Sequence, residues 1–138
     1  MKYNHAIIHT TKGDIYIDLF GDVSNTINNF IMHCKMSFYK DTSFYRVENF
    51  CIQGGRLTPF GKYKATPINH EITYHRHGQY SVGMADAGIG TADTTFFINK
   101  SENEWMNGRY IVFGQVVKGL QVVWDIKKDD KIIDIEVL

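Results

Sequence analysis

The chain has 138 residues, the usual length of one domain, and a domain of this size can bury roughly two-thirds of its unfolded surface. Basic and acidic side chains number 15 each, so the formal net charge is zero and no basic field is available to neutralise a nucleic-acid backbone. The sequence shows no secretory signal and no run near the roughly 18 apolar residues of a membrane span, so we expect one cytoplasmic domain over residues 1–138, with neither nucleic acid nor a membrane as its partner.

The first predicted elements are two strands joined by a tight turn. Segments 5–10 and 14–19 are rich in β-branched and aromatic residues, and the apolar residues of the second segment alternate with polar ones. Lys12 and Gly13 lie between the two runs. The pattern predicts an opening β-hairpin.

After this hairpin the hydrophobic period changes to that of a helix. Four apolar residues follow the i, i+3, i+4, i+7 spacing of one helical face: Ile27, Phe30, Ile31 and Cys34. This spacing predicts a helix over residues 23–36, and Asp22 or Ser24 is placed to cap its start.

The rest of the chain predicts further short strands and a second helix. The expected strands cover residues 42–47, 50–53, 80–85, 95–99, 111–117 and 132–138. The second helix is expected over 120–127, with Trp124 in the core, and Phe113 is also expected there. Many short strands with two helices predict an antiparallel barrel whose ends the helices close.

One arginine and one glutamine interrupt the apolar stretch 44–55, FYRVENFCIQGG. A guanidinium rarely buries unpaired, so Arg46 is expected outside the core. If Tyr45 and Val47 point inward, strand alternation turns Arg46 outward, and Gln53 can share its surface. A surface ion pair is the alternative role for Arg46.

Four fragments in series resemble the cyclophilin family of peptidyl-prolyl cis-trans isomerases. FYRVENFCIQGG resembles the family's F-H-R-V and F-M-I-Q-G-G signature, and TTKGDIYIDLF with TINNFIMHCKMSFY resembles its opening hairpin and first helix. GMADAGIGTADTTFFIN and EWMNGRYIVFGQVVKGLQVV resemble two later segments. The resemblance covers nearly the whole chain and implies a mainly β fold, a closed antiparallel eight-stranded β-barrel capped by two α-helices.

The resemblance also implies an activity and a set of site residues. The activity is isomerisation of X-Pro peptide bonds in proline-containing peptides or proteins by a monomer that needs no cofactor or metal, with cyclosporin A as an inhibitor. Arg46 matches the catalytic arginine. The implied substrate-binding residues are Phe50, Cys51, Gln53, Ala85, Asp86, Thr95, Phe97, Trp105, Met106 and Tyr110.

The sequence departs from the family pattern at four places. Three residues instead of the usual four separate Arg46 from Phe50, which can displace Arg46 from the pocket. Cys51 is smaller than the family's methionine, Asp86 adds a charge, and Thr95 replaces a glutamine. A slower or differently selective enzyme is therefore expected.

Two other interpretations stay open. The fold can serve a catalytically weak proline-peptide binding module or assembly factor, because fold does not fix function. Separately, HEITYHRH brings His70, Glu71, His75 and His77 close in sequence, but the spacing does not fit a helical zinc motif and favours a solvated loop.

Cys34 and Cys51 are expected to be reduced and buried.

Overall fold

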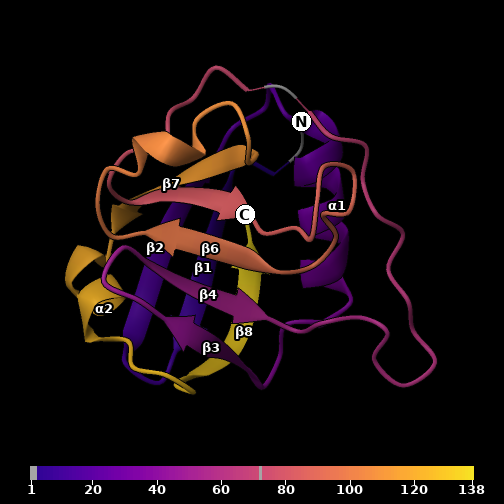
Figure 1. Ribbon diagram of the computed structural model, residues 1–138. Coiled ribbons are helices and arrows are strands. Elements are labelled where there is room, and N and C mark those ends of the chain that lie inside the picture. The colour runs from indigo at the N-terminus through magenta and orange to yellow at the C-terminus, as the bar shows by residue number, and fades with distance from the viewer. Residues whose placement is uncertain (1–2, 72) are drawn as a thin grey trace.

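In the computed structural model, which describes residues 3–71 and 73–138, eight antiparallel strands close into one barrel (Figure 1). Around the barrel they run in the order β1-β2-β7-β5-β6-β4-β3-β8, and β8 pairs with β1. Their bounds are β1 His5–Thr10, β2 Gly13–Leu19, β3 Thr42–Val47, β4 Cys51–Gly55, β5 Ser81–Met84, β6 Phe96–Asn99, β7 Val112–Lys118 and β8 Lys131–Val137. The predicted fold class is confirmed.

The two predicted helices are also confirmed, and Figure 1 places them on opposite sides of the barrel. Helix α1 spans Ser24–Lys35 and helix α2 spans Leu120–Asp125, while a short 3-10 helix, η1, covers Glu104–Met106. The predicted apolar face of α1 is buried: Ile27, Phe30, Ile31 and Cys34. Burial of this face fixes the helix against the barrel.

The predicted cap of α1 is wrong. Val23 holds the N-cap position and supplies no side-chain hydrogen bond. The capping group comes from Glu71, whose carboxylate accepts hydrogen bonds from the backbone N–H groups of Asn25 (3.2 Å) and Thr26 (2.6 Å). A distant carboxylate thus satisfies the free donors of the first turn and also complements the helix dipole.

Aromatic and β-branched side chains fill the barrel. Phe44, Phe96 and Phe113 are fully buried there, which confirms the prediction for Phe113. The prediction for Trp124 is wrong, because this side chain is 44% exposed. The six-residue helix α2 turns only a narrow face inward, and Val123 occupies it.

Strand β3 departs from simple alternation. Its pairing with β4 shifts register between Ser43 and Arg46, which marks a β-bulge or irregularity. Phe44 is therefore buried in the core, and the side chain of Tyr45 lies outside with Gln53, whose amide donates to the Tyr45 hydroxyl at 2.8 Å. The inward orientation expected for Tyr45 is wrong, whereas the outward orientation of Arg46 is found.

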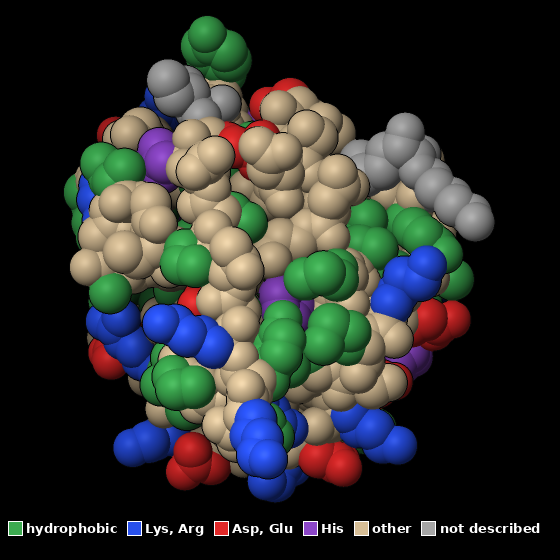
Figure 2. Space-filling model, turned by 90° about the vertical axis from the view of Figure 1, so that its right-hand side faces the viewer, with side chains coloured by type: hydrophobic (Ala, Val, Ile, Leu, Met, Phe, Trp, Pro, Cys, Tyr) green, Lys and Arg blue, Asp and Glu red, His purple; other side chains and the backbone are tan. Residues whose placement is uncertain are grey.

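Side chains of opposite charge are interspersed on the surface, as Figure 2 shows along the lower edge of one face. This arrangement agrees with the formal net charge of zero. None of the helices in the described part of the chain is long and apolar enough to cross a membrane. Cys34 and Cys51 are buried free thiols, as predicted.

Candidate active site

The site is built on a row of residues that crosses four neighbouring strands. Arg46 of β3 pairs with Gln53 of β4, Gln53 pairs with Phe97 of β6, and Phe97 pairs with Gly83 of β5. Directly opposed residues of antiparallel strands share one face, so this row lies on one side of the sheet. Here it is the outer side, because the neighbours Ile52 and Phe96 are buried in the barrel.

A pocket of about 320 Å³ opens over this row. We call it the main pocket. It is lined by Arg46, Phe50, Cys51, Gln53, Ala85, Asp86, Phe97, Trp105, Met106 and Tyr110. The structure thus brings together every predicted site residue except Thr95. Trp105 is 65% exposed and contacts the edge of Phe50, with ring centroids 5.6 Å apart, so it lies at the rim.

Phe97 forms a buried wall of the main pocket because Gly83 leaves room for its ring. A Cβ on Gly83 would lie 2.5 Å from Cζ of Phe97, a distance that the ring could not accommodate without moving. Phe97 is only 4% exposed and does not belong to the barrel core. Its role is therefore to line the pocket.

His77 supports the pocket from behind, and sequence reasoning missed this role. Its ring stacks on Phe97 with centroids 5.7 Å apart and an interplanar angle of 15°. Nε2–H donates to the carbonyl of Tyr110 at 2.9 Å, and Nδ1 accepts from the amide of Asn99 at 3.2 Å. Burial lowers the pKa of His77, against the hydrogen bond to Tyr110, and so favours the neutral ring.

The shortened turn between β3 and β4 keeps Arg46 on the pocket wall. Lys100 donates from Nζ to the carbonyl of Glu48 at 2.9 Å, and Asn103 donates from Nδ2 to the carbonyl of Phe50 at 3.0 Å. These bonds fix the turn, so the displacement considered for Arg46 does not remove it from the pocket. Sequence alone gave no signal for Lys100 or Asn103, because both lie far along the chain.

Arg46 is half-exposed and paired with a carboxylate. Its Nε lies 3.5 Å from Oε1 of Glu48, and its guanidinium carbon lies 5.7 Å from the centroid of the Phe50 ring. Both ion-pair partners are about half exposed, so solvent screens their attraction. The surface ion pair considered for Arg46 is therefore found together with its position on the pocket wall.

Cys51 faces the main pocket as a protonated thiol. Burial raises its pKa, and the charge of Arg46 only partly opposes this effect. A neutral thiol adds an apolar surface of modest size to the pocket. It is not activated as a nucleophile, because nucleophilic attack needs the thiolate.

A second hollow of about 280 Å³, the side pocket, adjoins the main pocket. The two share Gln53, Ala85 and Asp86, which form the ridge between them. Thr95 lines the side pocket and not the main one. Thr95 can therefore contact only a peptide that extends from the main pocket across the ridge into the side pocket.

The clustered histidines are separated in the structure. Glu71 caps α1, His75 stacks on Phe20 with centroids 3.8 Å apart, and His77 lies behind the main pocket. Within residues 3–71 and 73–138, no group of three or more His, Cys, Asp or Glu side chains could hold a metal ion. Glu71, His75 and His77 thus each contact a different part of the fold.

Comparison with known proteins gives a family and several named relatives. The profile of the family described as cyclophilin type peptidyl-prolyl cis-trans isomerase/CLD matches residues 5–136. Peptidyl-prolyl cis-trans isomerase B of Escherichia coli is 38% identical over 134 residues, 86% of this chain and 81% of that protein. Human peptidylprolyl isomerase domain and WD repeat-containing protein 1 is 36% identical over 126 residues, 86% of this chain and 20% of that protein. Several other relatives are also much longer proteins, of whose length this chain spans 20–24%.

Solved structures agree with the sequence comparison. A crystal structure of a Cryptosporidium parvum cyclophilin type peptidyl-prolyl cis-trans isomerase has a TM-score of 0.87 at 25% identity, with 99% of this chain and 98% of that chain covered. A structure of that protein in the presence of the dipeptide Ala-Pro gives 0.87 at 26% identity and covers 97% of this chain and 98% of that chain. The match of the family profile, the identity to the bacterial enzyme and the barrel together show that the chain belongs to the cyclophilin-type peptidyl-prolyl cis-trans isomerase family.

Proposed function

We propose that the chain accelerates rotation about X-Pro peptide bonds in protein substrates, and so assists folding or conformational switching. The observation that carries the proposal is the position of Arg46, a permanently charged side chain on the wall of a pocket that also presents the apolar side chains of Phe97 and Met106. Family membership supports the same activity. The enzyme is proposed to act as a cytoplasmic monomer on proline-containing peptides.

The chemistry needs one donor and an apolar cavity. An X-Pro bond rotates slowly because conjugation of the nitrogen lone pair gives the bond partial double-bond character, with a barrier of about 18–20 kcal/mol. In the twisted state the lone pair is localised on nitrogen and can accept a hydrogen bond. A donor that binds the twisted state more strongly than the planar state lowers the barrier.

Each part of the main pocket has a proposed role in this reaction. Arg46 donates to the imide nitrogen, since its guanidinium offers several donors in a rigid fork. The proline ring is held by Phe50, Phe97, Met106 and Tyr110. Gln53 and the backbone of Ala85 and Asp86 bind the peptide chain. Cyclosporin A is proposed to bind the same pocket and rim.

Substitution of Arg46 tests the proposal. Arg46→Ala should lower the rate at saturating peptide on the order of a hundredfold, the usual scale for one preorganised donor, with much less effect on the dissociation constant. Arg46→Lys should recover little, because an ammonium lacks the fork. Exchange NMR on an Ala-Pro peptide measures both quantities. Full activity of Arg46→Ala would contradict the mechanism.

The ion pair of Arg46 with Glu48 favours a second candidate, a proline-peptide binding module of low activity. The Glu48 carboxylate, 3.5 Å from Nε of Arg46, competes with the imide nitrogen for the guanidinium. The same exchange experiment separates the two functions. Peptide binding without acceleration by the wild type would favour the binding module, and gain of activity in Glu48→Gln would identify the ion pair as its cause.

A further inference from the structure

An ion pair joins the two segments that border the main pocket on its rim side. We call residues 104–110 the rim segment and residues 85–91 the ridge segment. Arg109 of the rim segment binds Asp86 of the ridge segment through two hydrogen bonds, Nη1 to Oδ2 at 3.0 Å and Nη2 to Oδ1 at 2.8 Å. This bidentate geometry is the strongest form of an arginine–carboxylate contact.

Each partner is fixed within its own segment. The Asp86 carboxylate also accepts from the backbone N–H of Gly88 at 3.0 Å, and its side chain is only 1% exposed. The guanidinium of Arg109 lies 4.3 Å from the centroid of the Tyr110 ring, and the backbone N–H of Arg109 donates to Met106. The pair therefore connects the backbone that carries Met106 and Tyr110 to the ridge between the pockets.

The position of Asp86 makes its charge relevant to a peptide. Asp86 lines both the main pocket and the side pocket, so a peptide that occupies both must cross it. Arg109 covers and neutralises this carboxylate, and the hydrogen bond to Asp86 raises the pKa of Arg109. The side chain of Arg109 itself remains 35% exposed beside the pocket.

We propose that Arg109, acting through Asp86, is a positioning and specificity-determining residue: it holds the rim segment on the ridge segment and prevents the Asp86 carboxylate from selecting basic peptides. This inference rests on the proposed isomerase function. Without Arg109, the negative charge of Asp86 is exposed where the peptide crosses the ridge. An exposed carboxylate attracts Lys and repels Glu in a bound peptide.

The test uses peptides of the forms Xaa-Ala-Pro-Phe and Ala-Xaa-Pro-Phe, with Lys or Glu as Xaa. Arg109→Ala should change the Lys-to-Glu ratio of kcat/KM on the order of tenfold toward Lys in at least one of the two peptide series. The change should come chiefly from KM. It should be smaller at high salt, because salt screens the charge of Asp86. The double variant Asp86→Asn with Arg109→Ala should return the ratio to its wild-type value. Arg109→Lys should keep the wild-type ratio but raise KM, because lysine supplies charge without the bidentate fork.

Arg76→Ala is the matched control. Arg76 pairs with Glu104 of the same rim segment at 2.6 Å, but both side chains are about two-thirds exposed and Arg76 does not line either pocket. This variant should leave rates and peptide preference unchanged. An Arg109→Ala variant with the wild-type ratio, or with an equal loss for Lys and Glu peptides, would overturn the inference.

NMR titration of the same peptides keeps the two proposals distinguishable. If the wild type accelerates none of the peptides, the isomerase proposal fails. The Lys-to-Glu ratio of dissociation constants in wild type and Arg109→Ala then still tests the role of Arg109. A shift of that ratio toward Lys supports the inference, and an unchanged ratio overturns it.

Discussion

His77 illustrates how much a single buried side chain contributes to the pocket. It stacks on Phe97 and holds the carbonyl of Tyr110, so one wall of the main pocket and another pocket-lining residue both depend on it. Only a neutral ring satisfies both of its neighbours, since Nδ1 must accept a hydrogen bond from the Asn99 amide. Burial, the dominant effect on the pKa of His77, lowers it from 6.5 and maintains this neutral form.

A pH profile of activity should report His77. Above pH 6.5 and up to about pH 8 the wild-type rate should be nearly flat, because arginine does not titrate there and a pKa lowered from 6.5 keeps the His77 ring mostly neutral. As the pH falls further and passes through the lowered pKa, a second N–H forms opposite the Asn99 amide, and the rate should decline. His77→Gln should remove this acidic decline, as measured by exchange NMR from pH 5 to 8.

The control is His75→Gln, which removes a half-exposed histidine outside the site. It should retain the wild-type profile. If His77→Gln shows the same acidic decline as the wild type, another group controls the activity at low pH.

Motif order predicts which residues meet in the pocket, but not what holds them there. The predicted residues, apart from Thr95, line the main pocket, and strand register places three of them, Arg46, Gln53 and Phe97, side by side. His77 and Arg109 escape prediction for a physical reason. Their contacts form between segments separated by 20 or more residues, and neither side chain belongs to a local pattern that indicates its partner.

Helix α1 depends on a capping group that lies outside it. Both carboxylate oxygens of Glu71 accept backbone N–H groups from its first turn, and Oε1 also accepts from the Thr26 hydroxyl at 2.6 Å. Glu71→Ala should lower the free energy of unfolding by about 1 kcal/mol, the typical effect of losing a helix cap. Urea denaturation measures this difference.

Glu102→Ala is a suitable control for the cap, because it removes an exposed carboxylate outside the helix. It should change the free energy of unfolding very little. The free energy of unfolding of Glu71→Gln should lie between those of Glu71→Ala and Glu102→Ala, because the amide oxygen can still accept a hydrogen bond. Equal stability of Glu71→Ala and wild type would show that solvent replaces the cap.

Periodicity predicts elements well where one face of each element is buried. The i, i+3, i+4, i+7 residues of α1 all lie in the core, and so the helix is found close to its predicted bounds. The same logic fails for β3, where the register shift between Ser43 and Arg46 turns Tyr45 outward. It also fails for Trp124, because α2 is short and buries little more than Val123. Bulges and short elements leave no periodic signal.

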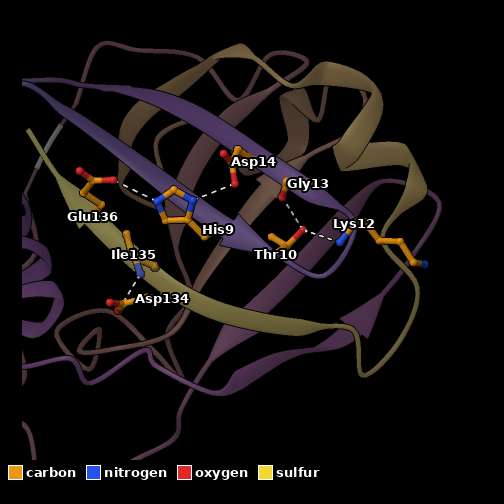
Figure 3. A network of polar contacts seen from close by, with 8 residues as sticks. All are labelled: His9, Thr10, Lys12, Gly13, Asp14, Asp134, Ile135 and Glu136. Atoms are coloured by element: carbon orange, nitrogen blue, oxygen red, sulfur yellow. Dashed lines mark hydrogen bonds and ion pairs between the residues drawn. The ribbon is translucent and has the colours of Figure 1, made fainter.

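At the scale of the whole molecule, a polar network on the outside of the barrel crosses three strands. Figure 3 shows the ring of His9, on β1, between Asp14 of β2 and Glu136 of β8. Nδ1 lies 2.8 Å from Asp14 and Nε2 lies 3.0 Å from Glu136. Each ring nitrogen has a carboxylate partner, so the arrangement is complete when the imidazole is protonated. The network thus links β1 to both of its neighbours, including the β1–β8 pair that closes the barrel.

The stability of the barrel should therefore depend on pH through His9. The hydrogen bond to Glu136 is the main effect that raises the pKa of His9 above 6.5, so the folded state binds a proton more tightly than the unfolded state. Its contribution is fully present below pH 6.5 and is lost as the pH rises through the higher folded pKa. Urea denaturation at several pH values above and below 6.5 measures the free energy of unfolding of wild type and His9→Gln. The advantage of the wild type over His9→Gln should shrink as the pH rises. High salt should weaken the difference, because these side chains are partly exposed. Glu136→Gln should retain only part of this pH-dependent difference in stability. A constant difference between wild type and His9→Gln at all pH values would show that the imidazolium does not stabilise the barrel.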